Sequence, residues 1–231
     1  MTTTAPALGD DAPYGVPATE RAFYVDEFAG ATLVVSIAAP SAAVLEAIGR
    51  AAAALADGGA RLVLVVGRED GAADRLGAVL PEAPVVLEAP PTPLDDAWLA
   101  DLWLAITDRH EVVVATGPGH EALVGAQLGV ALRALKLVIT DDRGGWGRPP
   151  RSFADVATHA DAFRAQLHER QGGAVVAALE LALAGGVTNV NLCRPEDLDR
   201  ELFTFDGAGT LFSERRLRRG RPAAGRRPAG R

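Results

Sequence analysis

The first half of the chain contains three short runs of apolar residues, mostly valine and leucine, at residues 31–39, 61–67 and 111–117. Polar and apolar residues do not alternate regularly in these runs, which is typical of strands covered on both faces. Strands of this kind belong to parallel sheets, in which helices connect one strand to the next. The pattern therefore predicts an α/β fold, specifically a three-layer αβα sandwich with a mostly parallel sheet.

The segments between and after these runs continue the same pattern. Ser41 is suited to cap a helix that Gly58 and Gly59 would end before the next strand. The closing segment, residues 201–213, is predicted to form a hairpin with its turn at residues 206–209. The other predicted strands are residues 83–89, 136–142 and 187–193, and the predicted helices are residues 41–60, 94–110, 120–135, 153–170 and 173–186.

A chain of 231 residues is long enough for one α/β domain, and we expect this domain to cover residues 31–213. Residues 1–30 are predicted to be a disordered leader, because their first half has neither the basic segment nor the apolar region of a signal peptide. Residues 214–231 are rich in arginine and low in complexity, so they are predicted to be a disordered tail.

The charge is unevenly distributed along the chain. The formal net charge is -7, but residues 215–231 hold eight of the 23 basic residues and no acid, which leaves 15 basic against 30 acidic residues in residues 1–214. A part with such an acidic excess repels phosphate backbones, so nucleic acid is an unlikely partner outside the tail. The single lysine of the chain is Lys136.

The cysteine content and the hydropathy pattern bear on the location of the protein. Cys193 is the only cysteine, which excludes an internal disulfide and suits a reducing compartment. No apolar stretch approaches the roughly 18 residues of a membrane span. We therefore predict a cytoplasmic protein without a membrane partner.

Four stretches resemble the amino acid kinase family, in particular acetylglutamate kinase and the kinase-like domain of N-acetylglutamate synthase. They are "TLVVSIAA", "ALRALKLVITDDRGG", "QGGAVVAALELALAGGVTNVNL" and "ELFTFDGAGTLFS", in that order. The last stretch is similar to the family's Glu-Leu-Phe-Thr-x-x-Gly-x-Gly-Thr element and is the most specific of the four. The resemblance covers residues 31–213 and implies an amino-acid-kinase-like fold and a role related to arginine biosynthesis.

The family's phosphate-binding lysines are missing from the corresponding positions. Its first strand runs into Lys-x-Gly-Gly, where this chain has Ser36, Ala38 and Ala39, and its second lysine corresponds to Ala177. The family's His-Gly-Gly-Gly loop corresponds to residues 66–69, Val-Gly-Arg-Glu. The family's Asn-Ala-Asp corresponds to His120, Glu121 and Ala122.

Phosphoryl transfer depends on charge neutralisation, so the missing cations predict a catalytically degenerate protein with no catalytic residue. ATP and Mg²⁺ are expected as cofactors only if an atypical kinase activity survives, with an arginine such as Arg68, Arg143 or Arg148 replacing the lysines. The residues that we assign to a vestigial nucleotide and phosphate region are Ser36, Gly67, Thr140, Asp141, Gly172 and Gly173.

The resemblance also implies an effector site, because the closing element contributes to an allosteric arginine site in arginine-inhibited members. Glu201 would receive the cationic end of the ligand, and the turn at Gly207 and Gly209 would offer backbone groups. A carboxylate suits a guanidinium, and glycine allows close approach of the backbone. The alternative is that these residues only form the turn of the last hairpin.

Three functions follow from the resemblance. The first is a regulatory or amino-acid-sensing module that binds an arginine-like amino acid and contacts a second copy of itself or an acetyltransferase partner. The second is an atypical acetylglutamate-kinase-like phosphotransferase. The third is a pseudoenzyme subunit that acts by interaction in a specialised pathway.

Other residues that could carry chemistry give weaker signals. His159 and His168 are predicted on opposite faces of one helix, so we expect no metal site there. His110 shows no partner motif, whereas His120 follows a strand end, where ligands of α/β sheets bind. Cys193 has the pattern of a buried filler residue. Trp98 and Trp103 are expected to pack, and Trp146 either anchors its glycine-rich loop or covers a pocket or a neighbouring subunit.

Overall fold

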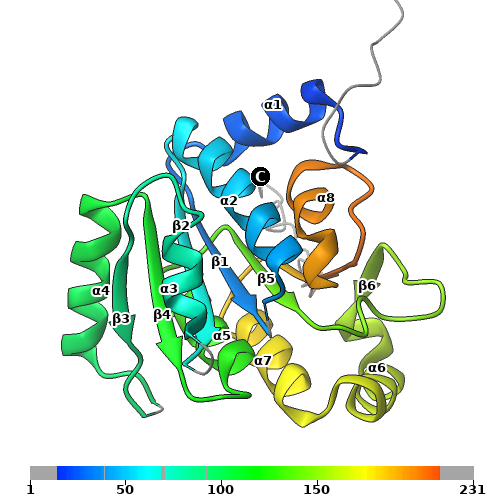
Figure 1. Ribbon diagram of the computed structural model, residues 1–231. Helices are drawn as coiled ribbons and strands as arrows, with labels where there is room; N and C mark the ends of the chain where they lie inside the picture. The colour runs from blue at the N-terminus through cyan, green and yellow to red at the C-terminus, as the bar shows by residue number, and fades with distance from the viewer. Residues whose placement is uncertain (1–14, 39, 69–70, 92, 214–231) are drawn as a thin grey trace, which may run out of the picture.

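The computed structural model describes residues 15–213, apart from residues 39, 69–70 and 92, and has three layers (Figure 1). An eight-stranded sheet forms the middle layer, in the order β3-β4-β2-β1-β5-β7-β8-β6. Neighbouring strands are parallel except β7 and β8, which are antiparallel. The strands are β1 Thr32–Ile37, β2 Arg61–Gly67, β3 Val85–Glu88, β4 Glu111–Thr116, β5 Lys136–Thr140, β6 Phe153–Asp155, β7 Asn189–Cys193 and β8 Thr210–Ser213.

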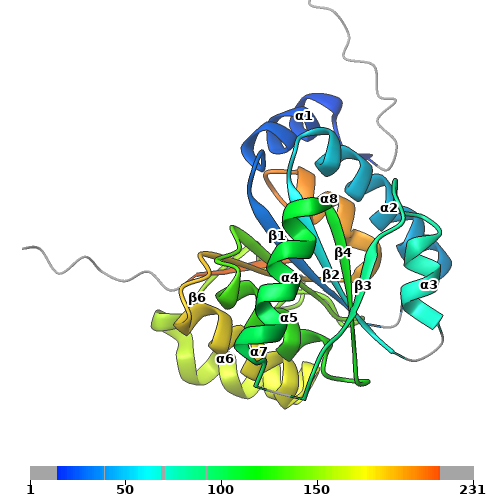
Figure 2. The same cartoon turned by 90° about the vertical axis from the view of Figure 1, so that its left-hand side faces the viewer.

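Helices cover both faces of this sheet (Figures 1 and 2). One apolar cluster joins a face of the sheet to α4, α5 and α7, with Leu102 and Leu179 among its fully buried members. The other cluster joins the opposite face to α2, α3 and α8. The helices are α1 Ala18–Glu27, α2 Ala42–Asp57, α3 Ala72–Gly77, α4 Asp96–Asp108, α5 Glu121–Ala131, α6 Val156–Gln171, α7 Gly173–Ala184 and α8 Leu198–Phe203, and a short 3₁₀ helix spans Pro195–Asp197.

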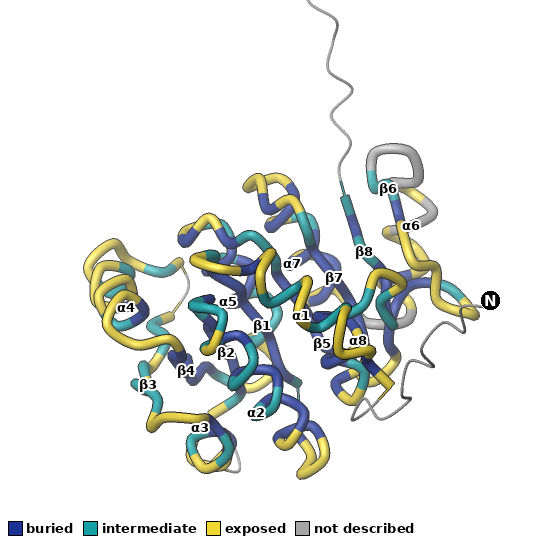
Figure 3. The backbone as a smooth tube through the Cα atoms, turned by 90° about the horizontal axis from the view of Figure 1, so that it is seen from above, coloured by how far each residue is buried: buried dark blue, intermediate teal, exposed yellow. Residues whose placement is uncertain are grey.

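The central strands are buried on both faces, as Figure 3 shows. Every residue of β1 and β4 is buried, and so are the five inner residues of β2. Burial of apolar surface contributes about 25 cal/mol for each Å², so these strands are stable only with helices on both sides. This arrangement confirms the predicted three-layer αβα sandwich.

The α2 segment shows how local sequence sets a helix. The Ser41 hydroxyl accepts a hydrogen bond from the Val44 amide at 3.4 Å, and Gly58 follows the last helical residue. Gly59 has a φ of +74°, a conformation that glycine adopts without strain. These residues act as the sequence predicted, and they lead directly into β2.

The structure differs from the prediction at the N-terminal side of the domain. Residues 18–27 form helix α1 instead of belonging to a disordered leader, whereas residues 1–14 lie outside the described part. Arg21 of α1 forms an ion pair with Asp199 of α8 at 2.5 Å, and its guanidinium lies 4.5 Å from the centre of the Phe203 ring. Contacts with α8 therefore stabilise the position of α1. The residues of α8 are far away in the sequence, so the pattern of the first thirty residues does not predict these contacts. The predicted tail, residues 214–231, also lies outside the described residues.

The predicted hairpin over residues 201–213 is wrong. Its first three residues belong to α8, and only Thr210–Ser213 forms a strand, which pairs with β7. The helical pattern of α8 consists of the buried residues Leu198, Leu202 and Phe203. Leu198 precedes the segment that we predicted to be a strand, so that segment alone does not contain the whole pattern. The predicted helix over residues 153–170 likewise begins with the short strand β6.

The described helices are short compared with the thickness of a membrane. The longest, α2 and α6, have 16 residues each. No helix in the described part of the chain has the length and apolar character that a membrane span requires.

Helix α5 approaches β1 closely at Gly125, and this contact is testable. A Cβ atom on Gly125 would lie 2.0 Å from the Ser36 hydroxyl oxygen, whereas one on Gly129, one turn later, would meet its nearest atom at 3.5 Å. We expect Gly125→Ala to lower the free energy of unfolding by about 1–3 kcal/mol through overpacking. Gly129→Ala is the matched control and should be neutral or stabilising by up to about 1 kcal/mol, because alanine favours helix.

Urea denaturation of both variants measures this difference. Equal effects of the two substitutions would contradict the close approach of α5 and β1. The double variant Ser36→Ala/Gly125→Ala should recover part of the loss, because it removes the oxygen that the new methyl group meets.

Candidate functional site

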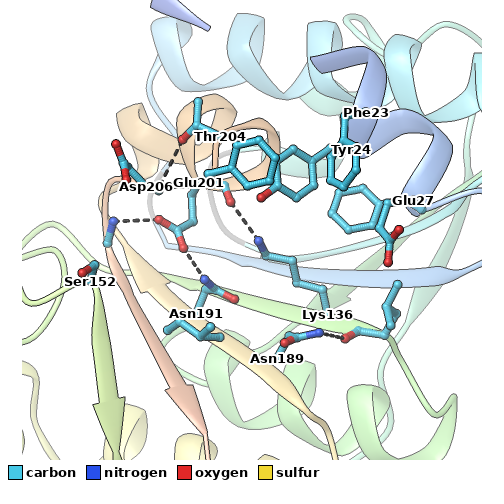
Figure 4. Close-up of a pocket in the computed structure, with 16 residues that line it drawn as sticks. Phe23, Tyr24, Glu27, Lys136, Ser152, Asn189, Asn191, Glu201, Thr204 and Asp206 are labelled. Atoms are coloured by element: carbon cyan, nitrogen blue, oxygen red, sulfur yellow. Dashed lines mark hydrogen bonds between the residues drawn. The ribbon is translucent and has the colours of Figure 1, made fainter. Parts of the chain in front are cut away.

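A pocket of about 340 Å³ opens on the sheet face that α1 and α8 cover (Figure 4). It begins at the N-terminal ends of β5 and β7 and extends to the loop between α8 and β8, residues 204–209. Three structural elements distant in sequence therefore meet there: α1, the β5–β7 pair, and α8 with its following loop. The lining residues are Phe23, Tyr24, Glu27, Phe28, Leu135, Lys136, Ser152, Asn189, Asn191, Glu201, Thr204, Phe205, Asp206, Gly207, Gly209 and Leu211.

Glu201 is a buried carboxylate that holds the α8–β8 loop. Its Oε2 atom accepts hydrogen bonds from the amides of Ala208 at 2.8 Å and Gly209 at 2.7 Å. Its Oε1 atom accepts a hydrogen bond from the side-chain amide of Asn191 on β7. Buried carboxylates require such donors, so the loop and the carboxylate stabilise each other.

Both predicted glycines of this loop are required by its geometry. Gly207 has a φ of +61°, and a Cβ atom there would lie 2.9 Å from the Glu201 Oε2 atom. A Cβ atom on Gly209 would lie 2.1 Å from the carbonyl oxygen of Leu192. The amide of Gly207 donates to the Thr204 hydroxyl at 3.1 Å. The loop therefore has little freedom to rearrange around the pocket.

Lys136, the single lysine of the chain, lines the same pocket. Its ammonium group donates a hydrogen bond to the backbone carbonyl of Glu201 at 2.8 Å and lies 6.0 Å from the centre of the Phe28 ring. Burial lowers the pKa of the Lys136 ammonium below its ordinary value, although the Glu201 carboxylate opposes this shift. A ligand carboxylate would relieve the cost of keeping this charge away from water.

Aromatic rings form the side of the pocket next to the Lys136 ammonium (Figure 4). Phe23 and Tyr24 of α1 lie 5.3 and 5.5 Å from Phe205 of the α8–β8 loop, measured between ring centres. Tyr24 also lies 5.6 Å from Phe28. Phe23 is 47% exposed and Phe205 is 67% exposed. Exposed rings beside a pocket offer π faces to a cation.

The structure brings Glu201, Gly207 and Gly209, the residues assigned to an effector site, together in the wall of one pocket. Their first contacts are with each other and with Asn191, so the Glu201 carboxylate already binds donors of its own chain. Sequence reasoning missed Lys136 and the aromatic residues of α1 as members of this site. The isolated lysine was the one signal that pointed to Lys136.

Two residues of the predicted phosphate region, Ser36 and Thr140, also meet, at the C-terminal ends of β1 and β5. The Thr140 hydroxyl donates to the Ser36 carbonyl at 3.0 Å and accepts from the Ala38 amide at 3.1 Å. Ser36 in turn donates to the carbonyl of Glu121 at 3.0 Å. A Cβ atom on Gly67 would lie 2.7 Å from the Glu121 Oε1 atom. A carboxylate therefore lies beside the strand ends, where it opposes an anion.

The remaining residues assigned to this region have other neighbours. The Asp141 carboxylate accepts from the amide of Arg143 at 2.8 Å. Gly172 and Gly173 join α6 to α7, where the Gly172 amide donates to the His168 carbonyl at 3.2 Å. Ala39 and Glu69 lie outside the described residues, and Arg68 forms an ion pair with Glu88.

Several of the other candidate residues contribute to packing or to internal hydrogen bonds. Cys193 is fully buried, and burial raises the pKa of its thiol well above the ordinary value, which disfavours a nucleophilic thiolate. Trp146 is buried and anchors its loop, and the Trp98 indole donates to the Glu88 carbonyl at 2.8 Å. The expected packing of Trp103 is only partial, because this residue is 47% exposed. His110, His120 and His168 are exposed, and the side chain of His159 lies outside the described part.

Comparison with known proteins defines the class of fold. No family model matches the sequence, and no curated protein matches it either. The arrangement of strands and helices is nevertheless an amino acid kinase fold, because it superposes on several solved members of that family.

Three solved structures illustrate this similarity. N-acetylglutamate synthase from Neisseria gonorrhoeae, complexed with coenzyme A and L-arginine, matches with a TM-score of 0.64 and 19% identity, over 85% of this chain and 64% of that one. Carbamate kinase from Giardia matches with a TM-score of 0.59 and 12% identity, over 80% of this chain and 99% of that one. Uridylate kinase from Archaeoglobus fulgidus matches with a TM-score of 0.55 and 14% identity, over 78% and 99%. This chain therefore spans less than two thirds of the synthase.

Substitutions of Glu201 test its role as the acceptor of the loop. We expect Glu201→Ala to lower the free energy of unfolding by roughly 3 kcal/mol, because it leaves buried amides without acceptors. Glu201→Gln is the matched control and should cost about 1 kcal/mol or less. Its carbonyl can accept from the loop, and its amide can donate to the Asn191 Oδ1 atom, which is buried without a hydrogen-bond partner. Chemical denaturation gives both values, and equal losses would contradict this role.

The pKa of Lys136 can be measured without interference from other lysines. After reductive methylation with ¹³C-formaldehyde, NMR should show a dimethyl-lysine signal that titrates below about 10.4, the ordinary lysine value. Because the unfolded chain binds this proton more tightly, the group contributes stability that rises with pH between its folded pKa and the ordinary value. Titration at or above that value would contradict the burial of this ammonium.

Proposed function

We propose that this chain is a regulatory, amino-acid-sensing module related to N-acetylglutamate synthesis, and that it binds a cationic amino acid, with L-arginine as the first candidate. The observation that carries this proposal is the composition of the pocket. One ammonium, three carboxylates and four aromatic rings line a single cavity of about 340 Å³. A zwitterion with a cationic side chain complements both kinds of charge.

The two ends of such a ligand would have different partners. Its α-carboxylate suits Lys136, whose ammonium lies in the inner part of the pocket. Its cationic side chain suits the π faces of Tyr24 and Phe205 and one of two carboxylates, Glu27 or Asp206, which lie on opposite sides of the pocket (Figure 4). Glu201 contributes its negative charge and, through its hydrogen bonds, the shape of the loop. A neutral or acidic amino acid would leave these carboxylates unpaired.

Similarity to the arginine-complexed synthase supports the choice of ligand. The fold matches that synthase over 85% of this chain, at 19% identity. We propose that regulation here acts through contact with an acetyltransferase partner or with a second copy of this chain. Phe23 and Phe205 would transmit the binding of the amino acid to that partner, because both line the pocket and both are exposed at the surface. A cytoplasmic location suits a sensor of a free amino acid.

The electrostatics at the strand ends support a regulatory role over a catalytic one. The Glu121 carboxylate lies against Gly67, and Ser36 forms hydrogen bonds within the protein at a position where the family carries a lysine. Ala177 replaces the second lysine and is exposed on α7. Phosphoryl transfer needs cations at these positions, so we infer that this chain does not transfer phosphate.

Thermal unfolding with amino acids tests the proposal directly. A ligand that binds only the folded chain stabilises it by RT ln(1 + [L]/Kd), or about 2.7 kcal/mol at a hundredfold excess over Kd. We expect L-arginine to raise the midpoint and L-citrulline, its uncharged counterpart, to raise it much less. The double variant Glu27→Gln/Asp206→Asn should lose most of the shift, whereas Glu46→Gln, an exposed residue on α2, should retain it.

Two further results would decide between this proposal and its alternatives. Bound L-arginine should raise the NMR-measured pKa of Lys136, because a carboxylate favours the ammonium form. Stabilisation by MgATP with N-acetylglutamate, together with ATP turnover, would overturn the proposal in favour of an atypical phosphotransferase. No response to either ligand would overturn it in favour of a pseudoenzyme that acts by interaction alone.

A further inference from the structure

A second cavity lies at the opposite ends of β5 and β7 and concentrates positive charge. It has a volume of about 520 Å³ and lies between the loop of residues 143–150, the segment after β7, and Ala208. Three of its lining residues are arginines, Arg143, Arg148 and Arg194, whereas one is acidic, Asp197. The cavity shares no lining residue with the amino-acid pocket.

This concentration is unusual for the chain. Residues 1–214 contain 15 basic and 30 acidic residues, and three of these 15 basic residues lie around one cavity. Three arginines that line one concave space raise the local positive potential, which favours an anion there. Arginine side chains offer forked donors that match phosphate and carboxylate oxygens.

The loop that carries two of these arginines is firmly anchored. The Trp146 side chain is buried, and its indole donates to Gln166 of α6 at 2.9 Å. The Trp146 amide donates to the Thr210 hydroxyl on β8 at 2.8 Å. Gly147 and Pro150 form an antiparallel bridge, which places Arg148 in the turn between them. A site held in this way loses little entropy when a ligand binds.

Arg194 approaches the same space from the other side. It is the first residue after β7, and its side chain crosses the Gly144 backbone, where its Cγ atom lies 3.0 Å from the position of a Cβ atom on Gly144. Its guanidinium is 3.9 Å from the Glu196 carboxylate, and both side chains are more than half exposed. Exposed pairs of this kind are weak, so a ligand anion can compete with Glu196 for the guanidinium.

We propose that this cavity binds a small molecule that carries a multiply charged oxyanion, either phosphate groups or several carboxylates. The volume is within the range of small-molecule sites, roughly 300–1,000 Å³. Arg148 and Arg194 would hold the anionic group from two sides, with Arg143 adding to the field. The ligand is distinct from the amino acid of the first pocket, because the two cavities have opposite charge.

Calorimetric titration of the full chain with pyrophosphate and, separately, with citrate tests the proposal at low ionic strength. We expect saturable binding of one equivalent of at least one probe, and the stronger probe identifies phosphate or carboxylate chemistry. Arg148→Gln and Arg194→Gln should each weaken binding roughly tenfold, the effect of one lost charged hydrogen bond. Arg75→Gln on α3, an exposed arginine outside the cavity, should leave affinity unchanged.

The arginine-rich tail is present in every variant, so it contributes equally to each titration. Equal affinity of all four proteins, or an equal loss in Arg75→Gln, would show diffuse charge attraction and overturn the proposal. So would the absence of saturable binding of either probe. Thermal melts of each variant establish that it is folded, and a retained response to L-arginine separates a failure at this cavity from a failure of the amino-acid pocket.

Discussion

Burial of the central strands on both faces is the constraint on which the rest of this structure depends. Helices cover both sides of β1, β2 and β4, because nearly every residue of these strands is buried and most are apolar. Ligands are therefore excluded from the middle of the sheet and can bind only where strands end. Both cavities lie at ends of the β5–β7 pair, one at each end.

The change of strand direction at β8 creates the loop that separates these cavities. Because β8 runs antiparallel to β7, the chain must turn back after α8, and residues 204–209 make that turn. Gly207 and Gly209 line the pocket, whereas Ala208, between them, lines the cavity. Glu201 holds this loop through two backbone amides. One buried carboxylate thus shapes a wall that both cavities use.

The distribution of charge gives the two cavities different chemistry. The pocket has a single ammonium among three carboxylates, and the cavity has three guanidinium groups beside one carboxylate. The strand ends near Ser36 and Gly67 belong to neither, and the Glu121 carboxylate lies there. An amino acid kinase fold can therefore keep its layers while the charge around its strand ends is redistributed, because the layers depend on apolar burial and not on those charges.

The sequence by itself determined the layers, most of the elements and the members of the closing loop. Apolar periodicity and capping residues such as Ser41 act over a few neighbours, so they can be read without coordinates. The tertiary structure alone decided that α1 packs on α8, that residues 198–203 are helical, and that Lys136 and Asn191 join Glu201. These outcomes depend on which buried polar groups find partners far away in the sequence, and no local pattern encodes that pairing.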